Sequence, residues 1–106
     1  MDTIKILGQT AANIATVLYT VPDLTQTVVS SLVVANRTSG ELTFRVSVSP
    51  AGAATDVADY LFYDVPLAGN STLTATLGIT LTETDVVRTY SSATGVSFNL
   101  FGVETS

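Results

Sequence analysis

Short runs of β-branched residues, each followed by turn-forming residues, recur along the whole chain. The clearest run is Glu41–Ser49, where Leu42, Phe44, Val46 and Val48 alternate with Thr43, Arg45, Ser47 and Ser49. Strict alternation places apolar side chains on one face of a strand and polar side chains on the other. This run therefore predicts a half-buried strand with Phe44 in the core.

The same pattern predicts seven or eight short antiparallel strands, over Thr3–Leu7, Ala15–Val21, Thr25–Ala35, Glu41–Ser49, Ala58–Val65, Ser71–Leu81 with a bend or bulge at Gly78, Val86–Tyr90 and Val96–Val103. Turns are expected at 36–40, 66–70, 82–85 and 91–95, with a loop or edge over Gln9–Ala15 and a loop over Pro50–Val57. No stripe of helical period competes. We predict a single all-β domain over residues 1–106, an antiparallel β-sandwich that is either immunoglobulin-like or a small jelly roll.

The sequence lacks the residues that most enzymes and metal sites depend on. The chain has no histidine and no cysteine, which removes the commonest general base and the commonest zinc ligands. We therefore expect no enzyme, no cofactor, no metal site and no catalytic residue. The remaining candidates for glycoside hydrolysis, or for a structural calcium ion, are five carboxylates: Asp56, Asp59, Asp64, Glu83 and Asp85. Turn chemistry accounts for them without either activity.

Charge argues against two classes of partner. Nine acidic residues and four basic ones give a net charge of −5. The four cations, Lys5, Arg37, Arg45 and Arg88, are scattered, whereas nucleic acids and anionic membranes attract clustered ones. We expect neither partner. The N-terminal apolar run is short and follows an acid, unlike a signal peptide, so synthesis in a cytoplasm is expected.

Three segments are apolar on both faces: 28–34, 60–63 and 98–101. A sandwich buries only one face of each sheet, so a second cover is needed. Either twist and loops hide the outer face, or the face is an interface. Charged residues make up only 12% of the chain, against about 25% usually, which favours the interface. Its candidate residues are Tyr60, Phe62, Tyr63 and Phe101.

Several short motifs occur in a familiar order. They are Tyr19-Thr20-Val21-Pro22, Ala35-Asn36-Arg37, Asp64-Val65-Pro66-Leu67, Asn70-Ser71-Thr72, Gly78-Ile79-Thr80-Leu81, Thr84-Asp85-Val86-Val87 and 96–104. From about Tyr19 to Glu104 the chain resembles small virion proteins of tailed bacteriophages, among them capsid decoration (cement) proteins and modules of tail fibres or baseplates. The related pattern often has glycine where Leu24 stands, so we expect that turn to differ.

The resemblance implies a structural protein of the virion. As a cement protein the chain would form an oligomer, a homotrimer in this group, and would bind the phage major capsid protein at the capsid surface after synthesis in the host cytoplasm. The alternative is a tail fibre or baseplate module that recognises a host surface. The resemblance carries no set of catalytic residues.

Overall fold

The computed structural model describes residues 2–10 and 15–106, and strands make up most of them. Eight strands follow one another: β1 (Asp2–Thr10), β2 (Ala15–Thr20), β3 (Gln26–Asn36), β4 (Leu42–Ser49), β5 (Tyr60–Leu67), β6 (Thr72–Leu81), β7 (Val86–Ser91) and β8 (Val96–Thr105). Two short 3-10 helices, η1 (Pro50–Gly52) and η2 (Val57–Asp59), lie between β4 and β5. The predicted all-β class is confirmed.

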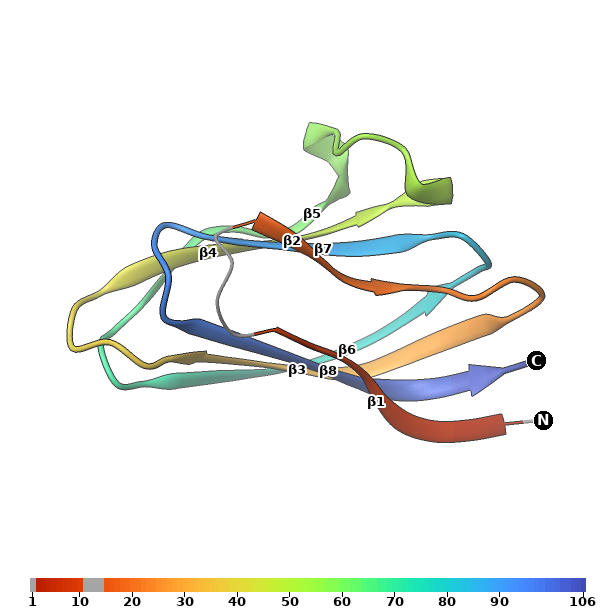
Figure 1. The fold of residues 1–106 in the computed structure, drawn as a ribbon, viewed down its shortest axis with the longest axis horizontal. Coiled ribbons are helices and arrows are strands. Elements are labelled where there is room, and N and C mark those ends of the chain that lie inside the picture. The colour runs from red at the N-terminus through yellow and green to blue at the C-terminus, as the bar shows by residue number, and fades with distance from the viewer. Residues whose placement is uncertain (1, 11–14) are drawn as a thin grey trace.

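The strands pair as a nested ribbon. β4 pairs with β5, β3 with β6, β2 with β7 and β1 with β8, all antiparallel. The ribbon is rolled, so that β3 also pairs with β8 and β4 with β7. Two four-stranded sheets result and face each other, sheet A (β1-β8-β3-β6) and sheet B (β2-β7-β4-β5) (Figure 1). This arrangement is a jelly roll. The predicted β-sandwich is therefore confirmed, and it is a small jelly roll rather than an immunoglobulin-like sandwich.

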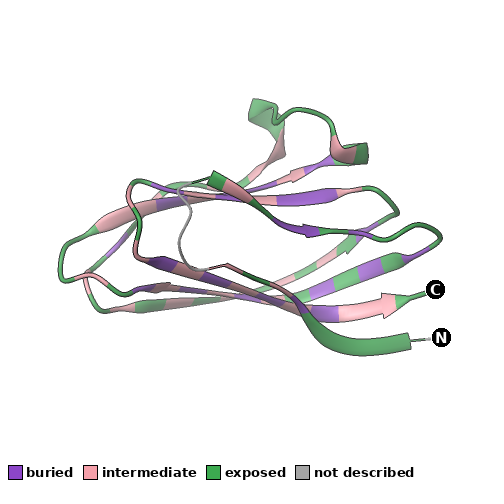
Figure 2. Cartoon of the chain, viewed as in Figure 1, coloured by how far each residue is buried: buried purple, intermediate pink, exposed green. Residues whose placement is uncertain are grey.

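The hydrophobic core lies between the sheets and is formed by alternate residues of each strand. In β8, Phe98 and Leu100 are buried, while Ser97 and Asn99 are only partly covered. Phe44 of sheet B meets Phe98 of sheet A edge to face, with ring centroids 6.2 Å apart. Figure 2 shows buried positions alternating with exposed ones along the strands. Phe44 is fully buried, as predicted.

Departures from the predicted boundaries occur at β1, at β5 and in the loop before β5. A turn is predicted from Pro66, but β5 continues to Leu67, with Pro66 opposite Thr43. Proline cannot donate a ladder hydrogen bond, and β5 accommodates it as the edge strand of sheet B. The loop predicted over Pro50–Val57 contains η1 and ends where η2 begins, so Ala58 and Asp59, predicted as strand, belong to a 3-10 helix instead. Of the loop or edge predicted over Gln9–Ala15, Gln9 and Thr10 belong to β1 and Ala15 begins β2, and both are edge strands. Residues 11–14 lie outside the described residues.

Two of the positive φ angles bear on the sequence predictions. Gly78 has φ 62°, and β6 carries one residue more than β3 beside it, so the predicted bend or bulge is a β-bulge. Leu24, the residue that stands in place of the expected glycine, has φ 56° and is 85% exposed. Its backbone N–H donates a 2.7 Å hydrogen bond to the Glu83 carboxylate. This turn thus holds a leucine in the left-handed region that favours glycine.

A buried tyrosine links the two sheets near one end of the sandwich. Tyr19 of β2 donates a 2.5 Å hydrogen bond to the Glu104 carboxylate of β8, and shares a 2.8 Å bond with the hydroxyl of Thr27 in β3. Lys5 Nζ lies 3.3 Å from the other oxygen of Glu104. Burial, reinforced by the bond to Glu104, raises the pKa of Tyr19 to about 12. The same hydrogen bond lowers the pKa of Glu104 below its ordinary value.

Candidate functional site

Four of the five candidate carboxylates hold turns together. Asp56 and Asp59 form a capping box at η2, and Glu83 and Asp85 accept hydrogen bonds from backbone amides of neighbouring turns. The distances from these amides to the carboxylate oxygens are 2.7–3.0 Å. Asp56, Asp59 and Asp85 therefore stabilise their own turns, as turn chemistry predicts, while Glu83 bonds a distant turn at Leu24.

Residues 2–10 and 15–106 contain no group of three or more His, Cys, Asp or Glu side chains that could hold a metal ion. None of the helices in that part of the chain is long and apolar enough to cross a membrane. The outer surfaces of the sandwich include the two outer sheet faces and the side between β5 and β6.

The structure does not bring the four predicted interface residues together. Tyr60 and Tyr63 lie in the aromatic cluster of sheet B described below. Phe62 packs against the core, with its ring centroid 5.8 Å from that of Phe44. Phe101 belongs to β8 of sheet A, where it alternates with buried core residues. The prediction therefore points to more than one surface.

The outer face of sheet A carries a continuous apolar patch, which we call the outer patch. One row across the sheet is Ile4 of β1, Val103 of β8 and Val28 of β3, which lie directly opposite one another. In the next row Ile6 lies opposite Phe101. Ile4 is 85% exposed, Ile6 52% and Val28 46%. These five residues form an apolar surface on a pleated sheet, which is typical of an interaction site.

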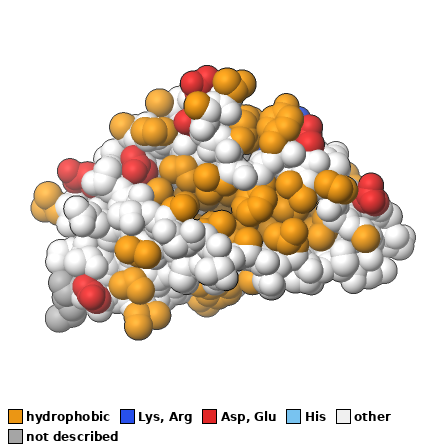
Figure 3. Space-filling model, turned by 180° about the vertical axis from the view of Figure 1, so that it is seen from behind, with side chains coloured by type: hydrophobic (Ala, Val, Ile, Leu, Met, Phe, Trp, Pro, Cys, Tyr) orange, Lys and Arg blue, Asp and Glu red, His pale blue; other side chains and the backbone are white. Residues whose placement is uncertain are grey.

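A second apolar region lies along the side of the sandwich where β5 and β6 are the edge strands of their sheets. Figure 3 shows hydrophobic side chains gathered across the middle of the view from behind. Five hydrophobic residues of β5 and β6 are only partly buried against the core: Phe62, Val65, Leu73, Leu77 and Ile79. The core is thus less completely covered between these two strands than at its centre.

The outer side of sheet B holds an arginine surrounded by tyrosines. The guanidinium of Arg45 lies 4.2 Å from the ring centroid of Tyr63, 4.8 Å from that of Tyr90 and 6.0 Å from that of Tyr60. It also donates hydrogen bonds of 2.6 and 3.1 Å to the two carboxylate oxygens of Asp64. This fork raises the pKa of Arg45 and lowers the pKa of Asp64. Arg45 and Asp64 are therefore both charged, and the hydrogen bonds and ring contacts hold the guanidinium in one orientation.

Irregular pairing of β5 gathers these side chains. The register between β4 and β5 shifts twice, between Phe44 and Val46 and again between Val46 and Ser47. Asp64 has φ 49°, in the left-handed region that aspartate tolerates better than most residues. Bulges redirect side chains at sheet edges. Here Tyr63 and Asp64, neighbours in sequence, both contact Arg45.

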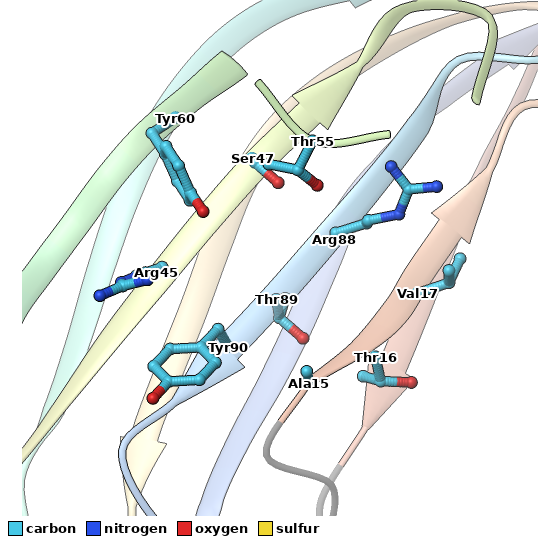
Figure 4. A pocket seen from close by; sticks show the side chains of 10 residues that line it. All are labelled: Ala15, Thr16, Val17, Arg45, Ser47, Thr55, Tyr60, Arg88, Thr89 and Tyr90. Atoms are coloured by element: carbon cyan, nitrogen blue, oxygen red, sulfur yellow. The ribbon is translucent and has the colours of Figure 1, made fainter. Parts of the chain in front are cut away.

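A pocket of about 350 Å³ lies beside this cluster on sheet B. Its lining comes from all four strands of the sheet and from the loop after β4, and includes Val17, Arg45, Tyr60, Arg88 and Tyr90 (Figure 4). The side chains of Ser47 and Thr55 add hydroxyl groups near one another. The pocket combines aromatic walls, apolar surface and a few polar groups, the usual composition of a ligand site.

Arg88 connects this pocket to the loop that follows β4. Its Nη1 donates hydrogen bonds to Ser49 Oγ at 2.5 Å and to the carbonyl oxygen of Ala53 at 2.7 Å. Its Nη2 donates to the carbonyl oxygen of Gly52 at 3.3 Å. All three acceptors are neutral, whereas Lys5 and Arg45 pair with the carboxylates of Glu104 and Asp64. The positive charge of Arg88 is therefore not balanced by a carboxylate among the described residues.

No protein-family model matches this chain, and no curated protein matches it. Among solved structures, it is similar to a chain from the crystal structure of the T13 IBDV viral particle, reported as a missing link in the evolution of icosahedral viruses. The TM-score is 0.55 at 13% sequence identity, and the match covers 97% of this chain and 30% of that chain. The likeness shows a shared fold over nearly all of the present chain.

The pocket was only partly accessible to sequence reasoning. Tyr60 is among the predicted interface residues, and the alternation of Glu41–Ser49 places Arg45 on the polar face. The roles of Arg88 and Tyr90 depend on the register that sets Tyr90 opposite Arg45 in the adjacent strand. No local motif encodes this register, so no signal in the sequence identifies the part of the pocket that β7 forms.

Proposed function

We propose that the chain is a structural virion protein, a decoration protein that binds the surface of an assembled phage capsid. The observation that carries the proposal is the jelly roll, which the chain shares over 97% of its length with part of a chain from a viral particle. The sequence resemblance to cement proteins of tailed phages supports the finer assignment. The proposed activity is binding alone, without catalysis.

The outer patch is the proposed contact surface. Ile4, Ile6 and Val28 are exposed on one sheet face, next to Phe101 and Val103. A stable interface buries about 800 Å² on each partner, which is within reach of a four-stranded sheet face. Assembly as a homotrimer, with the major capsid protein beneath it, would cover this surface and add to the stability of a chain without disulfides.

Binding through the outer patch should depend little on salt. The chain has a net charge of −5, and the patch itself is made of uncharged side chains. Screening at moderate ionic strength weakens exposed charge pairs but not apolar contacts. A protein that binds only the assembled shell also stabilises it, by ~2.7 kcal/mol per site at a hundredfold excess over Kd.

The test compares phage shells with and without the purified protein, heated at low and at high salt. We expect decorated shells to resist disruption at both salt concentrations. Phe101→Asp should abolish binding because it places a charge in the outer patch. Thr72→Asp is the matched control, since Thr72 is an exposed residue of the same sheet outside the patch. Equal disruption temperatures for decorated and bare shells would rule out the decoration role.

The tail fibre or baseplate module is the second candidate, and the pocket on sheet B is the observation that favours it. A receptor-binding module needs a concave site with aromatic and polar groups, and the pocket has both. Electron microscopy of virions labelled with an antibody against the protein separates the two candidates. Labelling of the capsid supports decoration, whereas labelling of the tail supports the module.

A further inference from the structure

We propose that the pocket on sheet B binds a saccharide residue that carries one carboxylate, as uronic acids do. This binding site goes beyond the decoration function and does not depend on it, because the pocket lies on the sheet opposite to the outer patch. Three features of the pocket favour such a ligand: its charge, the free donors of Arg88 and its aromatic walls.

The charge of the pocket differs from that of the molecule. Two of the four cations of the chain, Arg45 and Arg88, line it, and no aspartate or glutamate does. Arg45 is neutralised by the fork to Asp64. Arg88 meets only neutral acceptors in the described structure. The pocket therefore has one positive charge available to a ligand, in a chain whose net charge is −5.

The donors left on Arg88 suit a carboxylate. A guanidinium has five N–H donors in a planar fork. The contacts of Arg88 engage Nη1 twice and Nη2 once. This leaves the Nε–H and one Nη2–H without a partner among the described residues, two donors that a ligand can use. A carboxylate accepts such a pair in bidentate fashion.

The walls suit a sugar ring. A pyranose has apolar C–H faces and a rim of hydroxyl groups. Tyr60 and Tyr90 supply aromatic surface with a polar tip, while Ser47 and Thr55 supply hydroxyls that can donate or accept (Figure 4). A volume of about 350 Å³ lies at the small end of ligand pockets, which suits one or two sugar units.

Other anions fit this pocket less well. Nucleic acids and polyphosphates carry several charges, and a single unpaired arginine in an acidic protein cannot balance them. The side chain of a glutamate from another protein would accept hydrogen bonds from Arg88 but would not contact the tyrosine rings or the hydroxyl groups. A carboxylated sugar uses all three features.

The test is a titration followed by NMR chemical shifts of the backbone amides. The probes are methyl glucuronide, methyl glucoside as its neutral counterpart and N-acetylglutamate amide as a model acidic side chain. We expect the glucuronide to shift amides of Ser47, Arg88 and Tyr90, and to bind about tenfold more tightly than the glucoside, the ratio that one charged hydrogen-bonded contact supplies. Arg88→Gln should remove this preference, whereas Arg88→Lys should keep part of it.

The outcomes are distinct. Equal affinities for glucuronide and glucoside, or shifts outside the pocket, overturn the proposal. Equal affinities for glucuronide and N-acetylglutamate amide also overturn it and make the pocket a contact site for an acidic protein segment. If Arg88→Gln loosens the loop after β4, Tyr90→Ala provides a second test, because it removes one wall and should weaken the glucuronide while leaving Arg88 in place. Failure of this binding leaves the shell assay of the decoration role unaffected.

Discussion

Replacing Phe44 with alanine should remove the central contact between the two sheets. The side chain is fully buried, and its ring lies 5.8 Å from Phe62 in the same sheet and 6.2 Å from Phe98 in the opposite sheet, centroid to centroid. Truncation at such a site leaves a cavity and costs about 3–5 kcal/mol. That figure includes the loss of two aromatic pairs, each worth about 0.5–1.5 kcal/mol.

The loss is large relative to the stability of a domain of this size, which is about 5–15 kcal/mol. A change of 1 kcal/mol shifts Tm by about 4–8 °C in small domains, so Phe44→Ala should lower Tm by on the order of 15–30 °C. Urea denaturation followed by circular dichroism measures the same loss as a shift of the midpoint with an unchanged slope. Phe44→Leu keeps most of the volume and should cost only about 1 kcal/mol.

Phe101→Ala is the matched comparison, because Phe101 is an equally large side chain on the outer face of sheet A. Phe101→Ala should lower the free energy of unfolding of the isolated chain by about 1 kcal/mol or less, because Phe101 makes few contacts with core residues. If Phe44→Ala changes the free energy of unfolding by less than about 1 kcal/mol, or if Phe101→Ala costs as much, then the division between core and outer face described above is wrong.

Three further predictions concern the tyrosine link, a close backbone approach and a strained turn. The pKa of Glu104 is lowered in the folded protein. The resulting stability is present above the pKa of the unfolded chain, about 4.3, and is lost as pH falls through the lower pKa of the folded chain. The pKa of Tyr19 is raised, so its contribution to stability is present below pH 10 and is lost as pH rises towards 12. Unfolding titrations across pH should show both losses, and Glu104→Gln should flatten the acidic one. Gly102→Ala should cost about 1–3 kcal/mol or more in urea melts, because a Cβ there would lie 2.2 Å from a carbonyl oxygen of β3, whereas Gly40→Ala, with nothing within 4 Å, should change little. Leu24→Gly should raise the free energy of unfolding by about 0.5–1 kcal/mol through relief of the positive φ angle, and an unchanged or lower midpoint would show that the turn is not strained.

Strand positions were largely predictable because each strand is encoded locally. The alternation around Phe44 and the turn residues after Asn36 specify a period and its interruptions, and Gly78 marks the bulge in β6. The error at Pro66 has a physical cause. Proline ends most strands, but an edge strand needs no hydrogen bond on its outer side, and edge position is a property of the sheet order rather than of the local sequence.

The sheet order and the candidate site were not predictable in the same way. A jelly roll and an immunoglobulin-like sandwich both need short alternating strands, and they differ only in which strands pair. The pocket depends on that pairing, since Tyr90 meets Arg45 across β7 and β4, and on two register shifts that bring Tyr63 and Asp64 to the same arginine. Side chains that lie far apart in sequence become neighbours only once the register is known.

The nested pairing of the strands also gives folding a natural starting point. Of the ladder pairs, β4 and β5 are the two consecutive in sequence, joined by the loop 50–59. Once β4 and β5 have paired, β3 and β6 are already close, and each further pair closes only a short additional loop. The loss of chain entropy on loop closure is therefore divided among several small steps. We expect the ribbon to zip outward from this hairpin and to roll up afterwards, with β1 joining last. A chain rich in distant contacts can thereby fold faster than its contact order alone would suggest.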